Sequence, residues 1–282
     1  MSLAEYADRN RLHRVGARPS LPRYLADAWG RRDFAIAMAK YKIEASNQRN
    51  RLGMLWIFIK PTLNALLYGA IFGILQGASR PENFPMYVVI GVFLFEFFST
   101  SMNNGAKSIT GNGALVQSLA FPRITLPVST VIQQLMTLVP MLGVMVVYIL
   151  LLGAPITVEW LLMIPLVAVF TMFNLGVALI GARLTVHVRD LTQLLPLFTR
   201  ILFYTSGVLF SIETILASHP WAIALFDYHP LHEVLSIARG ALMPGVDYDP
   251  MYWLYFSVWS VAVFVAGVLF FWSAEERYGR VD

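Results

Sequence analysis

The sequence predicts an all-α integral membrane protein with six transmembrane helices. Of its 282 residues, 57% are hydrophobic and only 13% are charged, and the mean hydropathy is +0.61. Soluble domains usually carry about 25% charged residues, so this composition is typical of a membrane protein. The apolar runs are continuous rather than alternating, which favours helices and excludes a β-barrel.

Six apolar runs come close to the roughly 20 residues that a helix needs to cross a bilayer. We place the spans at residues 54–76, 85–106, 127–152, 156–182, 193–212 and 251–273. The chain is thereby divided into an N-terminal segment, residues 1–53, and a transmembrane domain, residues 54–282.

The basic residues predict the orientation. With a cytoplasmic N-terminus, the inner side receives all 21 Lys and Arg residues except Arg80 and Arg239, which lie outside, and Arg200, which lies within a span. Lys and Arg stay on the inner side of a membrane, so both termini are expected in the cytoplasm and the number of spans is even. The first 50 residues lack the apolar core of a signal peptide. We expect a multi-pass protein of the inner (plasma) membrane, and topology rather than nucleic-acid binding explains the net charge of +4.

Residues 27–46 are predicted to form an amphipathic helix in the inner membrane interface, because apolar and basic side chains separate onto different faces. The apolar face holds Trp29, Phe34, Met38 and Tyr41, and the basic residues around it are Arg31, Arg32, Lys40 and Lys42. A solvated helix packed on a partner protein is the alternative.

The stretch "NGALVQSLAFPRITLP", residues 112–127, lies between the second and third spans and is too short to cross a bilayer. Asn112 and Gly113 can open a helix, and Phe121-Pro122 ends it because proline cannot continue a helix. An apolar stripe is formed by Leu115, Val116 and Leu119. We expect a small amphipathic helix that rests either on the bilayer or in a groove of another protein.

Residues 213–250 contain two apolar runs that are also too short to cross, interrupted by His219-Pro220 and His229-Pro230. Short apolar runs broken by proline predict re-entrant helices, which would enter from the outer face and return before the last span. "HPLHE", with His229, His232 and Glu233, superficially suggests a metal site. The proline inside it and the lack of a second cluster favour side chains on the aqueous face of a re-entrant helix instead.

Glu96 lies near the middle of the second predicted span, and Arg200 lies about seven residues into the fifth. Buried ionisable groups are costly in a membrane and usually face a pathway or each other, so the two residues either pair or line a polar cavity. A protonated Glu96 that is hydrogen-bonded within the bundle is an equal alternative. Aromatic rings stack on sugar rings, so Phe95, Phe98, Tyr204 and Phe210 are candidates for lining a sugar conduit, although most aromatic residues in a bundle only pack.

The chain lacks several motifs of enzymes and metal proteins. GxxxxGK[ST], GxSxG and HExxH are absent, and there is no cysteine. The first of these motifs is the loop that holds the phosphates of ATP in many ATPases. We therefore expect no ATP and no other cofactor bound by this chain. We expect a protein that is not an enzyme.

Four pieces of the sequence resemble ABC-2-type permeases that export polysaccharides such as O-antigen, teichoic acid and capsule. They are "NRLGMLWIFIKPTLNALLYGAIFG" with Leu52-Gly53, Leu55-Trp56, Pro61 and Phe72, then "LAFPRITLPVS", "HVRDLTQLLPL" and "YHPLHEVLSIARGAL", in which His229 replaces the usual Asn. The run "KIEASNQRNRLGMLW" is most similar to the actinobacterial branch, which includes mycobacterial galactan exporters. That branch implies a polyprenyl-diphosphate-linked galactan as cargo.

The resemblance implies a homodimer that works with two copies of a separate ATPase subunit, which binds ATP and Mg²⁺. The short helix then couples the two proteins, with Leu115, Val116, Leu119 and Phe121 in a groove of the ATPase, Pro122 fixing the exit angle and Arg123 meeting an acidic group or a lipid phosphate. Arg189 and Asp190 belong to the same contact through the inner loop after the fourth span.

The resemblance also implies roles at the two membrane surfaces. Arg49, Arg51 and Lys60 would receive the lipid diphosphate at the inner mouth, unless they are ordinary positive-inside flanks. His229, Pro230 and Arg239 would belong to an outer gate. Three other functions remain open: an ABC-2 exporter of a drug or lipid, a membrane-embedded glycosyltransferase, and a secondary transporter with Glu96 as its proton site.

Overall fold

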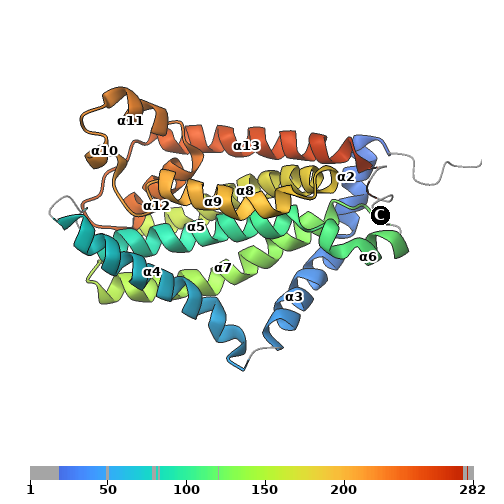
Figure 1. The fold of residues 1–282 in the computed structure, drawn as a ribbon, viewed down its shortest axis with the longest axis horizontal. Coiled ribbons are helices and arrows are strands. Elements are labelled where there is room, and N and C mark those ends of the chain that lie inside the picture. The colour runs from blue at the N-terminus through green and yellow to red at the C-terminus, as the bar shows by residue number, and fades with distance from the viewer. Residues whose placement is uncertain are drawn as a thin grey trace, which may run out of the picture.

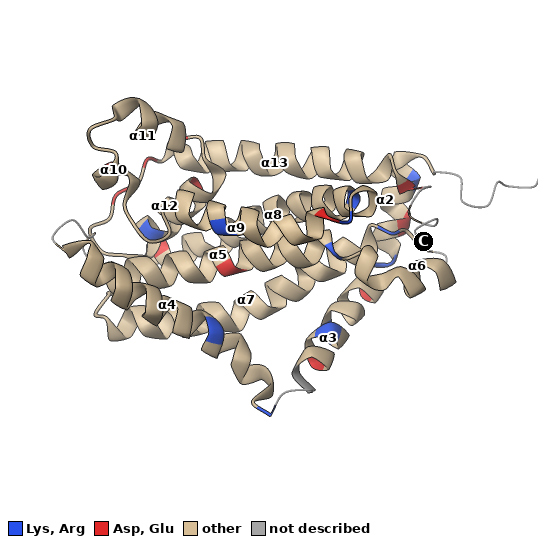
Figure 2. Ribbon diagram, viewed as in Figure 1, with Lys and Arg blue, Asp and Glu red and all other residues tan. Residues whose placement is uncertain are grey.

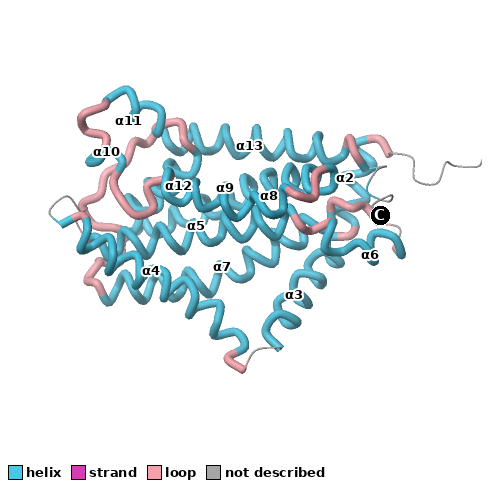
Figure 3. The backbone as a smooth tube through the Cα atoms, viewed as in Figure 1, coloured by secondary structure: helices cyan, strands magenta, loops and turns pink. Residues whose placement is uncertain are grey.

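The computed structural model describes residues 19–48, 51–77, 81, 83–119, 121–275 and 278, with residues 47 and 48 described by their backbone alone. Within these ranges the chain is helical, without strands, and most helices lie side by side in one bundle (Figures 1 and 3). Five helices are long and apolar enough to cross a membrane: α4 (Trp56–Leu75), α5 (Phe84–Ala106), α7 (Thr125–Leu151), α8 (Met163–His187) and α13 (Met251–Trp272). Short 3₁₀ turns, η1 (Gly53–Leu55) and η4 (Val158–Leu162), extend α4 and α8 at their N-terminal ends. These helices match five of the six predicted spans.

Helix α5 is the centre of the bundle. In an 18-residue apolar stretch of α5, 78% of the residues are buried, against 11% in the corresponding stretch of α4. Edge-to-face ring contacts connect it to its neighbours. The ring centres of Phe97 and Phe170 on α8 are 5.4 Å apart, and those of Phe170 and Phe256 on α13 are 5.9 Å apart. Helices α8 and α13 approach closely because two glycines meet there. A Cβ on Gly267 would lie 2.6 Å from the carbonyl oxygen of Gly176, so only glycine permits this packing.

The predicted span 193–212 differs from the other five. It forms α9 (Leu191–Thr205), whose 15 residues extend about 22 Å, less than the roughly 30 Å of a bilayer core. Residues 206–211 continue without helix, and α10 (Ile212–Ile215) follows. Helix α9 packs on α5 and α8 and carries the chain toward the end of the bundle where α10 lies (Figure 1). In the described part of the chain, α9 therefore runs along the bundle beside the five long helices but is shorter than any of them.

The predicted re-entrant segment forms two short helices at that end of the bundle, α11 (Pro220–Phe226) and α12 (Pro230–Leu242). Both begin with proline at their first position, where a missing N–H costs nothing. Helix α12 is inserted among α5, α8 and α13, and ten of its thirteen residues are buried. Helix α11 has no buried residue.

From residue 19 onward, the described N-terminal residues form α2 (Leu21–Gly30) and α3 (Arg32–Gln48), so the single helix predicted over residues 27–46 is wrong in its boundaries. The chain leaves helical geometry at Arg31, directly after Gly30, and glycine is a poor helix former. Helix α3 packs on α7 through Ala35 and Ala39, which are fully covered, while Trp29 and Tyr41 are about 70% exposed. The indole N–H of Trp272 donates to the carbonyl of Pro19, so the first and last described segments lie at the same end of the bundle.

Candidate functional site

The segment 112–127, which we call the coupling segment after the role that the resemblance implies, lies at the end of the bundle that holds α2 and the last described residues (Figure 1). It contains α6 (Gly113–Ser118), preceded by η3 (Thr110–Asn112), so the predicted helix is present but is six residues long. Leu119 follows in extended conformation, with φ −122° and ψ 137°. The chain then turns through Pro122 into α7.

The side chains of the coupling segment divide into an inward and an outward set. Val116 and Phe121 are 3% and 6% exposed and belong to a cluster of this chain that includes Tyr24, Leu179 and Phe271. Leu115 is half-buried against the same cluster. Leu119 is 50% exposed. Of the four apolar residues assigned to a partner's groove, Val116 and Phe121 are therefore used inside the chain, and Leu119 is the one left exposed.

Arg123 contacts an acidic group of its own chain. Its guanidinium lies 3.5 Å from the Glu275 carboxylate, and its backbone N–H donates to the same oxygen at 3.1 Å. The other carboxylate oxygen accepts a 2.7 Å hydrogen bond from the Tyr24 hydroxyl, which in turn accepts from the backbone N–H of Ile124 at 3.2 Å. Burial raises the pKa of Glu275, and these donors oppose the rise.

Sequence reasoning missed Tyr24 and Glu275. They are 251 residues apart, and the only signal was the acidic pair Glu275-Glu276 that follows the last apolar run. Arg189 and Asp190 form the exposed turn between α8 and α9, where the Thr192 hydroxyl donates to the Arg189 carbonyl. Figure 2 shows that Lys and Arg residues gather toward the end of the bundle with α2 and α6.

Glu96 borders two cavities between the helices, each of which is also lined by an exposed basic residue. With Arg200, Tyr68 and Phe95 it lines a cavity of about 210 Å³ between α4, α5 and α9. With Lys60 it lines another of about 260 Å³ toward α7. The two ion pairs of the described residues are Arg123–Glu275 and His232–Glu213, so neither joins Glu96 to Arg200. Glu96 and Arg200 thus border the same cavity without an ion pair between them.

The four candidate aromatic residues have different surroundings. Phe95 lines the cavity and contacts Phe203 edge to face at 5.1 Å. Phe98 is 3% exposed and stacks on Phe173, so it is part of the core. Tyr204 is 42% exposed on α9, and Phe210 lies in the non-helical stretch that follows. The structure does not bring the four together on one surface.

The residues assigned to the inner mouth are only partly described. Arg49 lies outside the described residues, and Arg51 is exposed just before η1. Lys60 is exposed on α4 and borders the larger of the two Glu96 cavities together with Trp56 and Gln134.

At the opposite end, Arg239 is 2% exposed and holds the non-helical stretch 206–211. Its guanidinium donates to the carbonyl of Val208 at 3.0 Å and lies 3.3 Å from the centre of the Tyr87 ring. The Tyr87 hydroxyl is shared between the carbonyls of Gly207 and Phe210, at 3.0 and 2.9 Å. Gln76 donates to the carbonyl of Leu209 at 2.8 Å. Four successive carbonyls without helical partners are thus satisfied by side chains.

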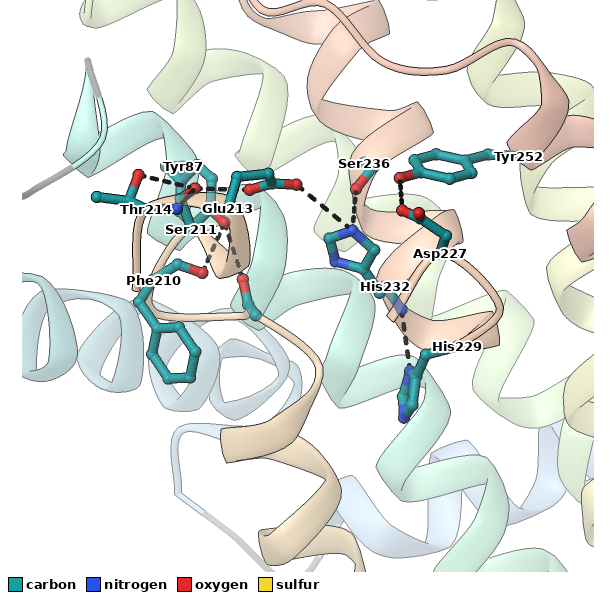
Figure 4. A network of polar contacts seen from close by, with 11 residues as sticks. Tyr87, Phe210, Ser211, Glu213, Thr214, Asp227, His229, His232, Ser236 and Tyr252 are labelled. Carbon is teal, nitrogen blue, oxygen red and sulfur yellow. Dashed lines mark hydrogen bonds and ion pairs between the residues drawn. The ribbon is translucent and has the colours of Figure 1, made fainter. Parts of the chain in front are cut away.

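A polar network covers this stretch (Figure 4). Glu213 accepts from the Ser211 hydroxyl at 2.6 Å and lies 3.7 Å from the His232 ring. The His229 ring caps α12 by accepting from the His232 backbone N–H, and Tyr252 donates to Asp227 at 2.7 Å.

Glu233, in the first turn of α12, is fully buried, and neither carboxylate oxygen has a hydrogen-bond partner among the described residues. Burial, with a smaller effect of Asp227, raises its pKa to about 8. Among the described residues no three His, Asp or Glu side chains are placed to hold a metal ion.

The comparisons with known proteins agree with this arrangement. Residues 35–243 match the ABC-2 type transporter family. The O-antigen export system permease protein RfbA of Klebsiella pneumoniae is 26% identical over 251 residues, which are 88% of this chain and 95% of the relative. RfbA of Myxococcus xanthus is 29% identical over 68% of this chain and 74% of its own, and the polysialic acid transport protein KpsM of Escherichia coli is 25% identical over 80% and 87%. Because the family match covers well over half of its residues, the chain belongs to the ABC-2 type transporter family.

Proposed function

We propose that the chain is the membrane subunit of an ATP-driven exporter of polysaccharide. The observation that carries the proposal is the extent of the likeness to an O-antigen export permease, which covers 88% of this chain. A member of the ABC-2 family is a membrane subunit of a transporter and not an enzyme. The described residues agree, since they contain long apolar helices and polar cavities between them.

The energy comes from a separate ATPase subunit, which binds ATP and Mg²⁺ and docks on the coupling segment. The exposed Leu119, with the edge of Leu115 beside it, offers an apolar contact at the basic end of the bundle. Arg189 and Asp190 are exposed and available as charged contacts for the same partner. Two ATPase copies serve two copies of this chain.

Two copies of the chain form the conduit between them. The cavities around Glu96 measure about 210 and 260 Å³, which is too little for a polymer to pass through one copy. Helices α4 and α9 carry exposed apolar side chains, among them Leu63, Leu67 and Ile201, and Arg200 and Tyr204 are also exposed on α9. A partner copy there would enclose Glu96, Arg200 and Tyr204 within a shared passage.

The cargo is a polyprenyl-diphosphate-linked glycan, and galactan is the specific candidate. Lys60 beside Trp56 at the larger Glu96 cavity supplies a cation and an aromatic face for the diphosphate and the first sugar, and Arg51 precedes them along the chain. The glycan leaves at the opposite end of the bundle, where α11 and α12 act as re-entrant helices of an outer gate held by His229, Pro230 and Arg239. Both termini are cytoplasmic, and α9 with residues 206–211 makes the sixth crossing.

Depletion of the chain in its own host tests this function. We expect lipid-linked glycan to accumulate inside the cell, measured by extraction of the lipid fraction and sugar analysis, and the glycan beyond the membrane to fall. Complementation with the intact chain should reverse both changes. If the lipid-linked glycan does not accumulate while a drug or a lipid is retained, the chain exports that other substrate.

A further inference from the structure

The carboxylate of Glu275 lies where three distant parts of the chain meet. Its Oε1 accepts from the backbone N–H of Arg123 at 3.1 Å, and its Oε2 accepts from the Tyr24 hydroxyl at 2.7 Å. The residue is 4% exposed and follows the end of α13 by three positions. Tyr24 is on α2, and Arg123 is in the coupling segment directly before α7.

The chemistry of this contact is specific to the beginning of α7. The backbone amides of Arg123 and Ile124 precede the first residue of α7, so the helix itself offers them no carbonyl partner. The Glu275 carboxylate takes the first amide and the Tyr24 hydroxyl takes the second, at 3.2 Å. Negative charge at a helix N-terminus is favourable, which offsets part of the cost of burying the carboxylate.

The contact has a position that matters for coupling. The coupling segment presents Leu119 outward at 50% exposure, and four residues later the same segment is tied to α2 and to the end of α13. A displacement of Leu119 by a docked protein therefore reaches the tie before it reaches α7. Without the tie, the displacement of Leu119 can be absorbed before it reaches α7.

We propose that Glu275 is a positioning residue for energy coupling, which with Tyr24 locks the exit of the coupling segment to α2 and α13 so that movement imposed by the ATPase is transmitted to the last membrane helix. This role rests on the proposed function, because it requires a docked ATPase. The proposal extends the coupling machinery to the C-terminal end of α13, which the sequence motifs did not indicate.

A second tyrosine provides a matched control. Tyr278 is fully buried in the same cluster as Tyr24, stacks on Phe271 at 4.6 Å and donates its hydroxyl to the Phe271 carbonyl at 3.0 Å. Tyr24→Phe and Tyr278→Phe each remove one buried hydroxyl and keep the ring. Only the first removes a contact with the coupling segment.

The test uses the full complex of permease and ATPase in proteoliposomes, loaded with the lipid-linked glycan extracted from depleted cells. Both ATP hydrolysis and glycan movement are measured, and their ratio is the readout. We expect Tyr24→Phe and Glu275→Gln to lower the ratio about fivefold, as loss of one buried hydrogen bond worth about 1 kcal/mol implies, with the complex still assembled. Tyr278→Phe should keep the wild-type ratio.

An unchanged ratio in Tyr24→Phe and Glu275→Gln overturns the positioning role, as does a parallel fall of both activities and of the melting temperature in all three variants, which indicates lost stability alone. Failure of the wild-type complex to move glycan in the presence of ATP overturns the proposed function itself. That failure is recognised in the wild type before any variant is measured.

Discussion

Arg239 explains how a stretch of non-helical backbone is kept inside a membrane bundle. Unpaired carbonyls are costly where water is absent, so such backbone persists only where protein groups satisfy it. Arg239, Tyr87 and Gln76 come from three different elements and satisfy the carbonyls of residues 207–210. The guanidinium reaches this place by passing over Gly91 on α5. A Cβ at Gly91 would lie 2.8 Å from the guanidinium and 2.9 Å from the Val208 carbonyl oxygen.

We therefore expect Gly91→Ala to destabilise the protein by about 1–3 kcal/mol, the usual cost of overpacking a buried site. Gly143→Ala is the control, because a Cβ at Gly143 on α7 meets no atom within 4 Å. In a helix that change should be neutral or stabilising by up to about 1 kcal/mol. Thermal unfolding of both variants in detergent measures the difference, and equal melting temperatures would contradict the close packing of Arg239.

Glu233 and His232 are neighbours on α12 whose burial makes stability depend on pH in opposite directions. Burial raises the pKa of Glu233 from 4.5 to about 8, so its contribution is fully present below pH 4.5 and is lost as pH rises toward 8. Burial lowers the pKa of His232 below its usual 6.5, so its contribution is present above pH 6.5 and is lost as pH falls. The two effects oppose each other below pH 6.5. Above it only that of Glu233 remains.

The free energy of unfolding should therefore fall between pH 6.5 and 8, with a slope of up to about 1.4 kcal/mol per pH unit, the value for one proton. Glu233→Gln should remove most of this fall, because glutamine keeps the size of the side chain and does not ionise. Chemical unfolding in detergent at a series of pH values checks the prediction. Parallel profiles for the wild type and the variant would show that Glu233 ionises normally.

At the residue scale, the sequence identified charges that matter but not their partners. Glu96 and Arg200 were expected to pair or to share a cavity. Sequence gives the depth of each side chain along its helix, but not the rotation of the helix about its axis, so it cannot decide between the two. Arg239 was singled out by a resemblance, yet its carbonyl partners lie on a stretch that the pattern predicted to be helical. The Tyr24–Glu275 contact depends on tertiary structure alone.

At the scale of an element, the coupling segment uses different residues for docking and for folding. Leu119→Asp should weaken the association with the ATPase about tenfold, equivalent to about 1.4 kcal/mol, and leave the melting temperature of the isolated permease unchanged. Val116→Ala should lower the melting temperature and leave the association with the ATPase unchanged. Val116 is 3% exposed inside the chain, and its truncation leaves a cavity that costs on the order of 1–3 kcal/mol. Co-purification of tagged ATPase and thermal unfolding report the two effects. Loss of association in both variants would indicate that the whole of α6 enters the partner.

Helix positions were predictable where length and hydropathy alone decide them. Five spans match helices to within a few residues, apart from the fourth, where η4 precedes α8 and the helix continues five residues beyond the predicted end, to His187. The fifth predicted span was apolar enough, but its second half leaves the helix at Ser206, and Gly207 then adopts φ +71°, which favours glycine. The hydrogen bonds that make this possible come from α4, α5 and α12 and leave no local pattern.

At the scale of the whole molecule, the two ends of the bundle are built from different elements. One end gathers α2, the coupling segment, the turn at Asp190 and the last described residues (Figures 1 and 2). The other gathers α10, α11, the buried α12 and their polar network (Figure 4). Whether these ends face opposite sides of the membrane depends on α9, which is the one passage shorter than a bilayer core.

Because the chain has no cysteine, single introduced cysteines report this topology without background. Thr157, Asp190 and Ser218 are exposed, and α8 separates the first two while α9 separates the last two. In intact cells an impermeant maleimide should label Thr157→Cys and Ser218→Cys, and should label Asp190→Cys only after permeabilisation. If α9 fails to cross, Ser218→Cys will label together with Asp190→Cys and not with Thr157→Cys. That result would place α12 on the cytoplasmic side and exclude it from an outer gate, because its helix follows Ser218 without another long passage.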